Sequence, residues 1–198
     1  MRVYPFDVRE ALLESAKQEF MDCGFEKASL RSICKRAGVT TGAFYSYFEK
    51  KEDLFSAIVE PTLLEFYENS QSILHLQRQQ HYTHADSEEK GVEFMLDHRD
   101  EFILLFDCSA GTRYEGFRED VLNGFMRKSY QVHIDFHVGK PMDPNLLNIL
   151  LGMKFEEYRQ LLYSDYPPEE VHRLVRRLAG FTDAGFAQLM RDLQADDE

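Results

Sequence analysis

The chain of 198 residues lacks the features of a membrane or secreted protein. No stretch approaches the ~18 consecutive apolar residues of a transmembrane helix. The first ten residues, MRVYPFDVRE, contain no apolar core of a secretory signal. Cysteine is also scarce: Cys23, Cys34 and Cys108 are odd in number, and none lies in a CxxC spacing. This argues for reduced, packed thiols rather than a disulfide or zinc framework. We therefore expect a cytoplasmic protein with no cofactor and no membrane partner.

The sequence is also poor in the alternation of apolar and polar residues that predicts β-strands. Glycine and proline, with 11 and 6 residues, mark only a few breaks. The 43% of hydrophobic residues is ordinary for a globular protein that buries a core. The pattern predicts an all-α fold.

Positive charge is scarce overall, since the net charge is −12, but its distribution is uneven. Residues 1–54 hold equal numbers of basic and acidic side chains, and the whole acidic surplus lies in residues 55–198. Within residues 27–51, six basic side chains face the single acid Glu49; they are Lys27, Arg31, Lys35, Arg36, Lys50 and Lys51. A polyanion responds to such a local patch rather than to the overall charge, so a nucleic-acid partner stays open.

Apolar periodicity and capping residues predict a series of helices. Gly24 suits the end of the first helix, while Ser29 and Thr40 suit the starts of the second and third. Pro61 predicts a kink or break in the fourth helix. The predicted ranges are 7–23, 30–37, 41–48 and 51–77, then, after a polar loop at 78–87, 87–98, 100–109, 115–138, 144–164 and 168–194.

The second and third predicted helices, joined by a turn that contains Gly38, have the spacing of a helix-turn-helix. Phe44 and Phe48 are four residues apart, so we expect them to pack back onto the first two helices. Tyr45 then lies on the opposite, outward side. The small side chains of Gly42 and Ala43 let the backbone approach DNA closely. Hydroxyls for phosphates and base edges are supplied by Thr40, Thr41, Tyr45, Ser46 and Tyr47.

The segment FMDCGFEKASLRSICKRAGVTTGAFYSYFEKKEDLF resembles the DNA-binding segment of the TetR (tetracycline repressor) family of bacterial transcription regulators. The shared features are the aromatic-x-x-x-Gly-Phe pattern at 20–25, Ser-Leu-Arg-x-Ile at 29–33, Ala-Gly-Val-Thr at 37–40 and Tyr-x-Tyr-Phe-x-x-Lys-x-x-Leu at 45–54. The resemblance covers about 45 residues. It implies DNA contacts from Ser29, Arg31, Thr41, Gly42, Ala43, Tyr45, Ser46 and Tyr47, with Lys51 on a backbone phosphate.

The resemblance also implies an architecture with a helix-turn-helix domain at residues 1–50. A helical domain at 51–198 would bind a small effector and form a homodimer through the last two long helices. We therefore expect a ligand-responsive repressor of a palindromic double-stranded DNA operator, and not an enzyme. An activator, a ligand-independent regulator and a metal- or thiol-dependent all-α enzyme remain alternatives.

Eight aromatic residues of the C-terminal part are candidates for lining an effector pocket, although ordinary core is the better explanation for each one singly. They are Phe66, Tyr67, Phe94, Phe102, Phe106, Phe117, Phe125 and Tyr158. The acidic surplus of this part is consistent with a cationic effector, but it also serves solubility.

His133 and His137 have the spacing of two metal ligands on one helical face. No carboxylate or cysteine at a matching spacing completes such a site, which leaves Asp135 and Cys108 as open candidates for a further ligand, and we expect no metal. Cys108 would need a neighbouring base to act as a nucleophile, and the sequence sets none beside it. An inert thiol is the simpler interpretation.

Overall fold

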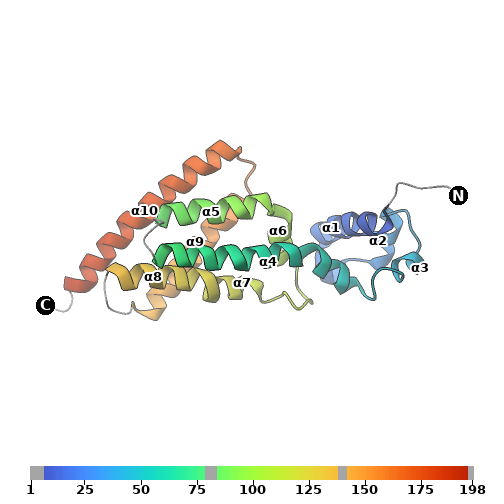
Figure 1. Cartoon of the computed structure of the whole chain (residues 1–198), viewed down its shortest axis with the longest axis horizontal. Helices are drawn as coiled ribbons and strands as arrows, with labels where there is room; N and C mark the ends of the chain where they lie inside the picture. The colour runs from blue at the N-terminus through green and yellow to red at the C-terminus, as the bar shows by residue number, and fades with distance from the viewer. Residues whose placement is uncertain (1–6, 79–83, 138–141, 196–198) are drawn as a thin grey trace. The chain divides into compact units, whose positions relative to one another are not determined.

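The computed structural model describes residues 7–78, 84–137 and 142–195, and every regular element in these ranges is a helix (Figure 1). The all-α prediction is confirmed. The chain divides into two compact units: a first unit of Met1–Glu65 with His98–Arg118, and a second unit of Phe66–Asp97 with Glu119–Glu198. Within the described ranges, no helix combines the length and apolar character that crossing a membrane requires.

The first unit holds the helix-turn-helix. Its elements are α1 (Val8–Lys27), α2 (Leu30–Arg36), α3 (Thr41–Phe44), the first part of α4 (Lys51–Arg78) and α6 (Arg99–Asp107). Leu12, Phe20 and Phe55 have no exposed surface and form the centre of its core. The rings of Phe20 and Phe55 lie 5.3 Å apart, so α1 and α4 share one apolar contact. Against expectation, α4 continues through Pro61 without a break.

Helix α1 extends beyond its predicted end at Cys23. Gly24 has a φ of +76°, a left-handed value that glycine adopts without strain and that interrupts the regular helix. Helical hydrogen bonding nevertheless resumes, since the Ala28 N–H donates to the carbonyls of Gly24 and Phe25. The glycine therefore produces a kink rather than the end of the helix.

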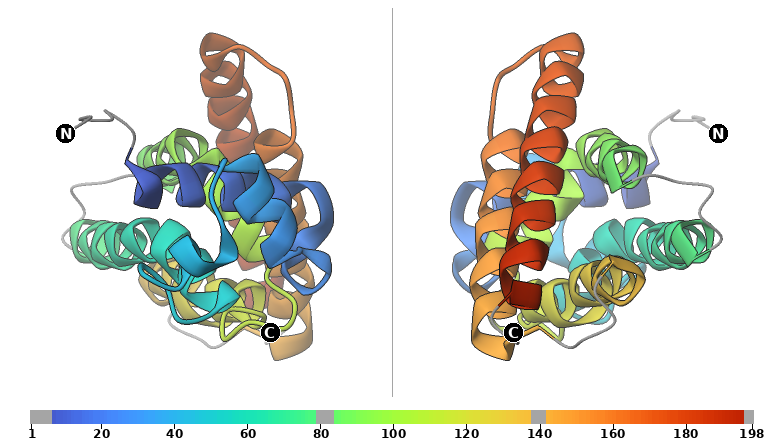
Figure 2. Two further views of the ribbon diagram at one scale, coloured as in Figure 1. Left: turned by 90° about the vertical axis from the view of Figure 1, so that its right-hand side faces the viewer. Right: turned by 90° about the vertical axis from the view of Figure 1, so that its left-hand side faces the viewer.

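The second unit contains α5 (His84–Asp97), η1 (Leu122–Met126), α8 (Arg127–His137), α9 (Pro144–Leu162) and α10 (Pro168–Ala195), together with the second part of α4 (Figure 2). Both α9 and α10 pack on α5. Its core includes a buried ion pair: Lys154 and Glu88 are 3% and 4% exposed, and Lys154 Nζ lies 2.7 Å from Glu88 Oε2. Ion pairs this deeply buried are uncommon because both charges lose their hydration.

The single helix predicted at 115–138 is divided into α7 (Phe117–Val121), the π-helical η1 and α8. A π-helical turn widens the helix by one residue per turn and occurs mostly in short pieces. Gly124 lies in its centre. Apolar periodicity alone does not predict such an insertion.

Candidate nucleic-acid interface

Three local interactions shape the helix-turn-helix. The Ser29 side chain accepts a hydrogen bond from the Ser32 N–H at the start of α2, at 3.4 Å. Thr40 Oγ1 accepts from the Ala43 N–H at the start of α3, at 3.1 Å. Between the two helices, Gly38 has a φ of +70°, and the Val39 N–H donates to the carbonyl of Cys34 at 2.9 Å. The predicted caps and the glycine turn are confirmed.

The inner face of α3 is built from phenylalanine, as predicted. Phe44 has no exposed surface and Phe48 is 7% exposed, with their rings stacked at 5.8 Å. Helix α3 is shorter than expected, because it ends at Phe44 and continues as a turn through Tyr47. Phe48 keeps its place on the inner face because its N–H still donates to the carbonyl of Phe44.

The outer face of this segment carries the predicted hydroxyls. Thr40, Thr41, Tyr45, Ser46 and Tyr47 are all exposed, and we call these five residues the hydroxyl face. The exposed fractions are 62% for Tyr45 and 49% for Tyr47. Gly42 is also exposed and Ala43 is half-buried. Two large aromatic side chains left in water beside small residues are typical of a surface that binds a partner.

Positive side chains accompany the hydroxyl face. Lys27, Arg31 and Lys35 are exposed, as is Ser29, and none of the three cations has an ion-pair partner among the described residues. Arg36 pairs with Glu19 and Asp22 at 3.4 and 3.2 Å. The pair with Asp22 is exposed, and exposed pairs contribute little and are screened by salt.

The Lys51 side chain is half-buried, and its ammonium bonds to backbone carbonyls. Its ammonium donates to the carbonyls of Phe25 and Ala28, at 2.5 and 2.9 Å, and lies 4.3 Å from the centre of the Phe25 ring. Burial lowers the pKa of Lys51, although Cys23 and Glu26 act in the opposite direction. The geometry therefore does not support the expected phosphate contact: its donors are used to cap the carbonyl end of α1.

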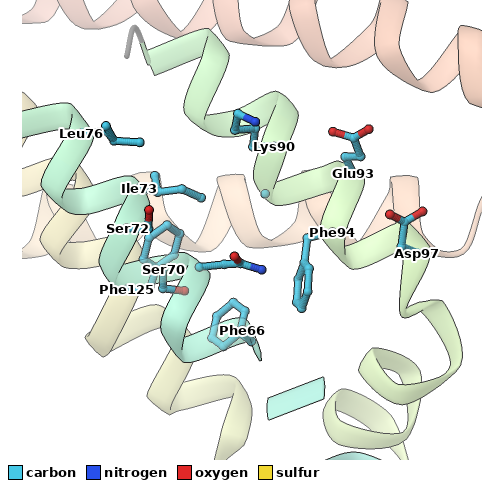
Figure 3. Close-up of a pocket in the computed structure, with 12 residues that line it drawn as sticks. Phe66, Ser70, Ser72, Ile73, Leu76, Lys90, Glu93, Phe94, Asp97 and Phe125 are labelled. Atoms are coloured by element: carbon cyan, nitrogen blue, oxygen red, sulfur yellow. The ribbon is translucent and has the colours of Figure 1, made fainter. Parts of the chain in front are cut away.

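The second unit contains a cavity of about 300 Å³ between α4, α5 and η1 (Figure 3). Phe66, Phe94 and Phe125 are the three predicted pocket residues that line it. The remaining walls are Ile73 and Leu76, with a polar edge of Asn69, Ser70, Ser72, Lys90, Glu93 and Asp97. The combination of aromatic walls and a few polar groups is typical of a small-molecule site.

The other five aromatic candidates do not line this cavity. Phe102, Phe106 and Phe117 pack against one another in the first unit, with ring centres 5.5 to 6.4 Å apart. Tyr67 is 48% exposed. The Lys154 ammonium lies 5.3 Å from the centre of the Tyr158 ring. Burial raises the pKa of Tyr158 well above its ordinary value. The sequence pattern alone does not distinguish which of the eight aromatic residues lie in the cavity, in the core or on the surface.

Alternative chemical sites receive no support from the described residues. No group of three or more potential ligands there has the geometry of a metal site. The side chains of His133 and His137 lie outside the described part of the chain. Cys108 is half-buried, and burial is the main cause that raises the pKa of its thiol. Its neighbour Ser109 is buried and donates its hydroxyl hydrogen to the carbonyl of Leu105.

Comparison with known proteins assigns the helix-turn-helix. Residues 12–58, which include α2, α3 and the start of α4, match the family model of bacterial regulatory proteins, tetR family. This segment of the chain is therefore similar to the tetR family. The match coincides with the tetR-like segment described above and contains the whole hydroxyl face.

Relatives of the tetR segment include the transcriptional repressor BepR of Brucella suis, 43% identical over 53 residues, and the regulator AcrR of Shigella flexneri, 44% identical over 54 residues. These matches cover 27% of this chain and only 25% of each relative. The fold of the whole chain is similar to that of a TetR-like regulator from Rhodococcus sp. RHA1, with a TM-score of 0.63 and 18% identity, covering 93% of this chain and 100% of the other. A regulator from Aquifex aeolicus VF5 gives a TM-score of 0.61 at 22% identity, over 89% and 99% of the two chains.

Proposed function

We propose that this protein is a DNA-binding transcription regulator that reads its operator with the hydroxyl face. The observation that carries the proposal is the exposure of Tyr45 and Tyr47 on a segment whose inner side is sealed by Phe44 and Phe48. A second support is the tetR-family model, which spans this segment in residues 12–58. Relatives of the same segment are named as transcriptional regulators, and BepR as a repressor.

The proposed contacts divide into two classes. Gly42 and Ala43 allow close approach to the major groove, where Thr41, Tyr45, Ser46 and Tyr47 reach base edges and phosphates. Ser29, Arg31 and Thr40 contribute from α2 and the turn. The cations Lys27, Arg31 and Lys35 supply the attraction to the phosphate backbone that makes binding depend on salt. Lys51 supports this surface from behind rather than touching DNA.

We infer that the protein acts as a homodimer through α9 and α10. Ile149 and Met153, one turn apart on α9, are 61% and 63% exposed, and Phe181 on α10 is 74% exposed. Such exposed apolar side chains on two long helices suit an isologous interface. A symmetric dimer presents two hydroxyl faces to the two halves of a palindrome, spaced about one helical turn or ~34 Å apart.

The cavity of the second unit is the proposed effector site, since three aromatic rings and a polar edge surround it. An effector that prefers one dimer geometry would shift the population toward it and alter operator affinity. Release of DNA makes the protein a repressor, whereas tighter binding makes it an activator. Residues 1–50 are the proposed DNA-binding domain and 51–198 the effector and dimer domain, acting in the cytoplasm.

Selection of genomic fragments by the purified protein tests this proposal. We expect enrichment of a short palindrome whose half-sites lie about one helical turn apart. The enriched fragment should bind in a mobility-shift assay and lose binding as salt increases. Recovery of the same fragments with an unrelated acidic protein, or no enriched motif at all, would overturn it.

A further inference from the structure

The ends of α1 and α6 meet in the first unit, which brings together cysteines that are distant in the sequence. The Phe25 N–H donates to the carbonyl of Cys108 at 2.9 Å. Beside this bond, Gly111 packs so closely on Glu26 that a Cβ at Gly111 would lie 2.9 Å from Glu26 Cγ. The loop after α6 is thus held directly against the segment that follows Cys23.

The two thiols at this junction differ in accessibility. Cys23 is exposed, and its thiol donates to the carbonyl of Glu19 at 3.2 Å. Cys108 is half-buried, and its pKa is raised by burial first, then by Asp107 and by Cys23 itself. The backbone bond between Phe25 and Cys108 places Cys108 opposite the residue two positions after Cys23. The third thiol, Cys34, is buried in α2.

A positive charge completes the junction. The Lys51 ammonium is held at the end of α1 by the carbonyls of Phe25 and Ala28, and it lies within electrostatic range of Cys23. The exposure of Cys23 makes it the thiol that an oxidant meets first, with the half-buried Cys108 behind it as a resolving partner.

We propose that Cys23 and Cys108 form a peroxide-responsive thiol pair that closes to a disulfide between α1 and α6. The Cys23 thiolate attacks one peroxide oxygen, the O–O bond breaks, and the leaving hydroxide takes up a proton to give water and a sulfenic acid on Cys23. The Cys108 sulfur then attacks the Cys23 sulfur; the S–O bond breaks, and the departing hydroxide takes the Cys108 proton. Two thiols are oxidised, one peroxide is reduced, and two waters form.

The pair occupies a position from which it can influence the helix-turn-helix. Helix α1 packs on α2, and Ser15 of α1 donates its hydroxyl hydrogen to the Ile33 carbonyl of α2 at 3.0 Å. A cross-link at the end of α1 would restrain this assembly relative to α6. Oxidant sensitivity of DNA binding is therefore expected, and this consequence alone rests on the proposed function.

Peptide mapping of the full chain tests the thiol pair without DNA, so its failure is distinct from failure of the proposed function. Reduced protein is treated with hydrogen peroxide, alkylated and digested with trypsin, which places the three cysteines on peptides 18–27, 32–35 and 100–113. We expect a linked pair of peptides 18–27 and 100–113 in most chains, absent after dithiothreitol. The Cys34→Ser control should form the same link.

Two further variants distinguish the roles. Cys108→Ser should accumulate a sulfenic acid on Cys23 that dimedone traps, whereas Cys23→Ser should leave Cys108 reduced. Circular dichroism verifies that each variant is folded. Peptide mapping of the chain without substitutions tests the proposal even if a variant does not fold. Disulfides that join two chains through Cys23 would overturn the proposal, as would oxidation of Cys34 before Cys23. Glutathione in the same tube is the positive control, and the absence of a linked peptide after the peroxide has oxidised it would also overturn the proposal.

Discussion

At the scale of single residues, Lys51 connects two helices with one ammonium group. It caps the carbonyls at the end of α1 while its backbone begins α4. Hydrogen bonds from a charged donor contribute more than neutral ones, so we predict that Lys51→Met lowers the free energy of unfolding by about 2 kcal/mol. Urea unfolding measures this loss. Lys35→Met, at an exposed position on α2, is the matched control, and equal stability of both variants would contradict the capping role.

Lys154 is the second residue whose contribution to stability depends on where its charge lies. Its ammonium lies 2.7 Å from Glu88 and 2.8 Å from Glu157 in a buried site. We predict that Lys154→Met destabilises the protein by about 3–5 kcal/mol, because it leaves the buried carboxylate of Glu88 without its counter-ion. The double change of Lys154→Met with Glu88→Leu should recover much of this loss in thermal unfolding. A double variant less stable than the single one would contradict this prediction, because it would show that Glu88 stabilises the fold without Lys154.

At the scale of helical elements, the helix-turn-helix was predictable because its signals are local. Ser29 and Thr40 cap helices within three residues of themselves, and the left-handed Gly38 lies two residues before the cap Thr40. The Phe44 and Phe48 spacing likewise depends only on helical geometry. These features need no knowledge of distant parts of the chain.

Other features depend on distant contacts and were therefore not predictable from local patterns. The hydrogen bond from the Lys51 ammonium to the Phe25 carbonyl forms only because the end of α1 lies beside the start of α4. The π-helical η1 is a departure from the α-helix that apolar periodicity does not predict. Phe125 and Phe106 both lie in predicted helices, yet Phe125 lines a cavity and Phe106 packs in a core of the first unit.

The cap of α3 gives a prediction at this scale. Thr40 Oγ1 accepts the Ala43 N–H, so Thr40→Ala removes one of the few bonds that fix a helix of 4 residues. We expect a loss of about 1 kcal/mol in stability, together with weaker operator binding. Thr40→Ser, which keeps the acceptor, should restore stability in thermal unfolding. Failure of the serine variant to do so would assign the effect to the lost methyl group.

At the scale of the whole molecule, the uneven charge distribution separates two tasks. The net charge of −12 resides outside residues 1–54, which keeps the remainder soluble and leaves the basic patch beside the hydroxyl face. We predict that Lys35→Ala weakens binding to all DNA sequences alike and reduces the slope of log affinity against log salt by about one. A loss confined to the preferred sequence would instead place Lys35 among the residues that read bases.

The proposed dimer gives the second prediction for the whole molecule. Ile149, Met153 and Phe181 expose more than half of their side-chain surface on α9 and α10. Ile149→Glu places a charge on this surface, and we expect a monomer in light scattering with operator affinity at least tenfold lower. Leu64→Glu, at a similarly exposed position on α4, should remain dimeric. A dimeric Ile149→Glu variant would move the interface elsewhere.

The most direct test of the account is the affinity of Tyr45→Ala for the selected operator. Tyr45 is 62% exposed, with its ring centre 5.1 Å from that of the buried Phe44, and Tyr67→Ala, at a 48% exposed position on α4, is its control. We predict that Tyr45→Ala loses at least tenfold in a mobility-shift assay, while its oligomeric state and melting temperature stay unchanged, and that Tyr67→Ala binds normally. Undiminished operator binding by Tyr45→Ala would contradict the assignment of the hydroxyl face as the DNA-reading surface.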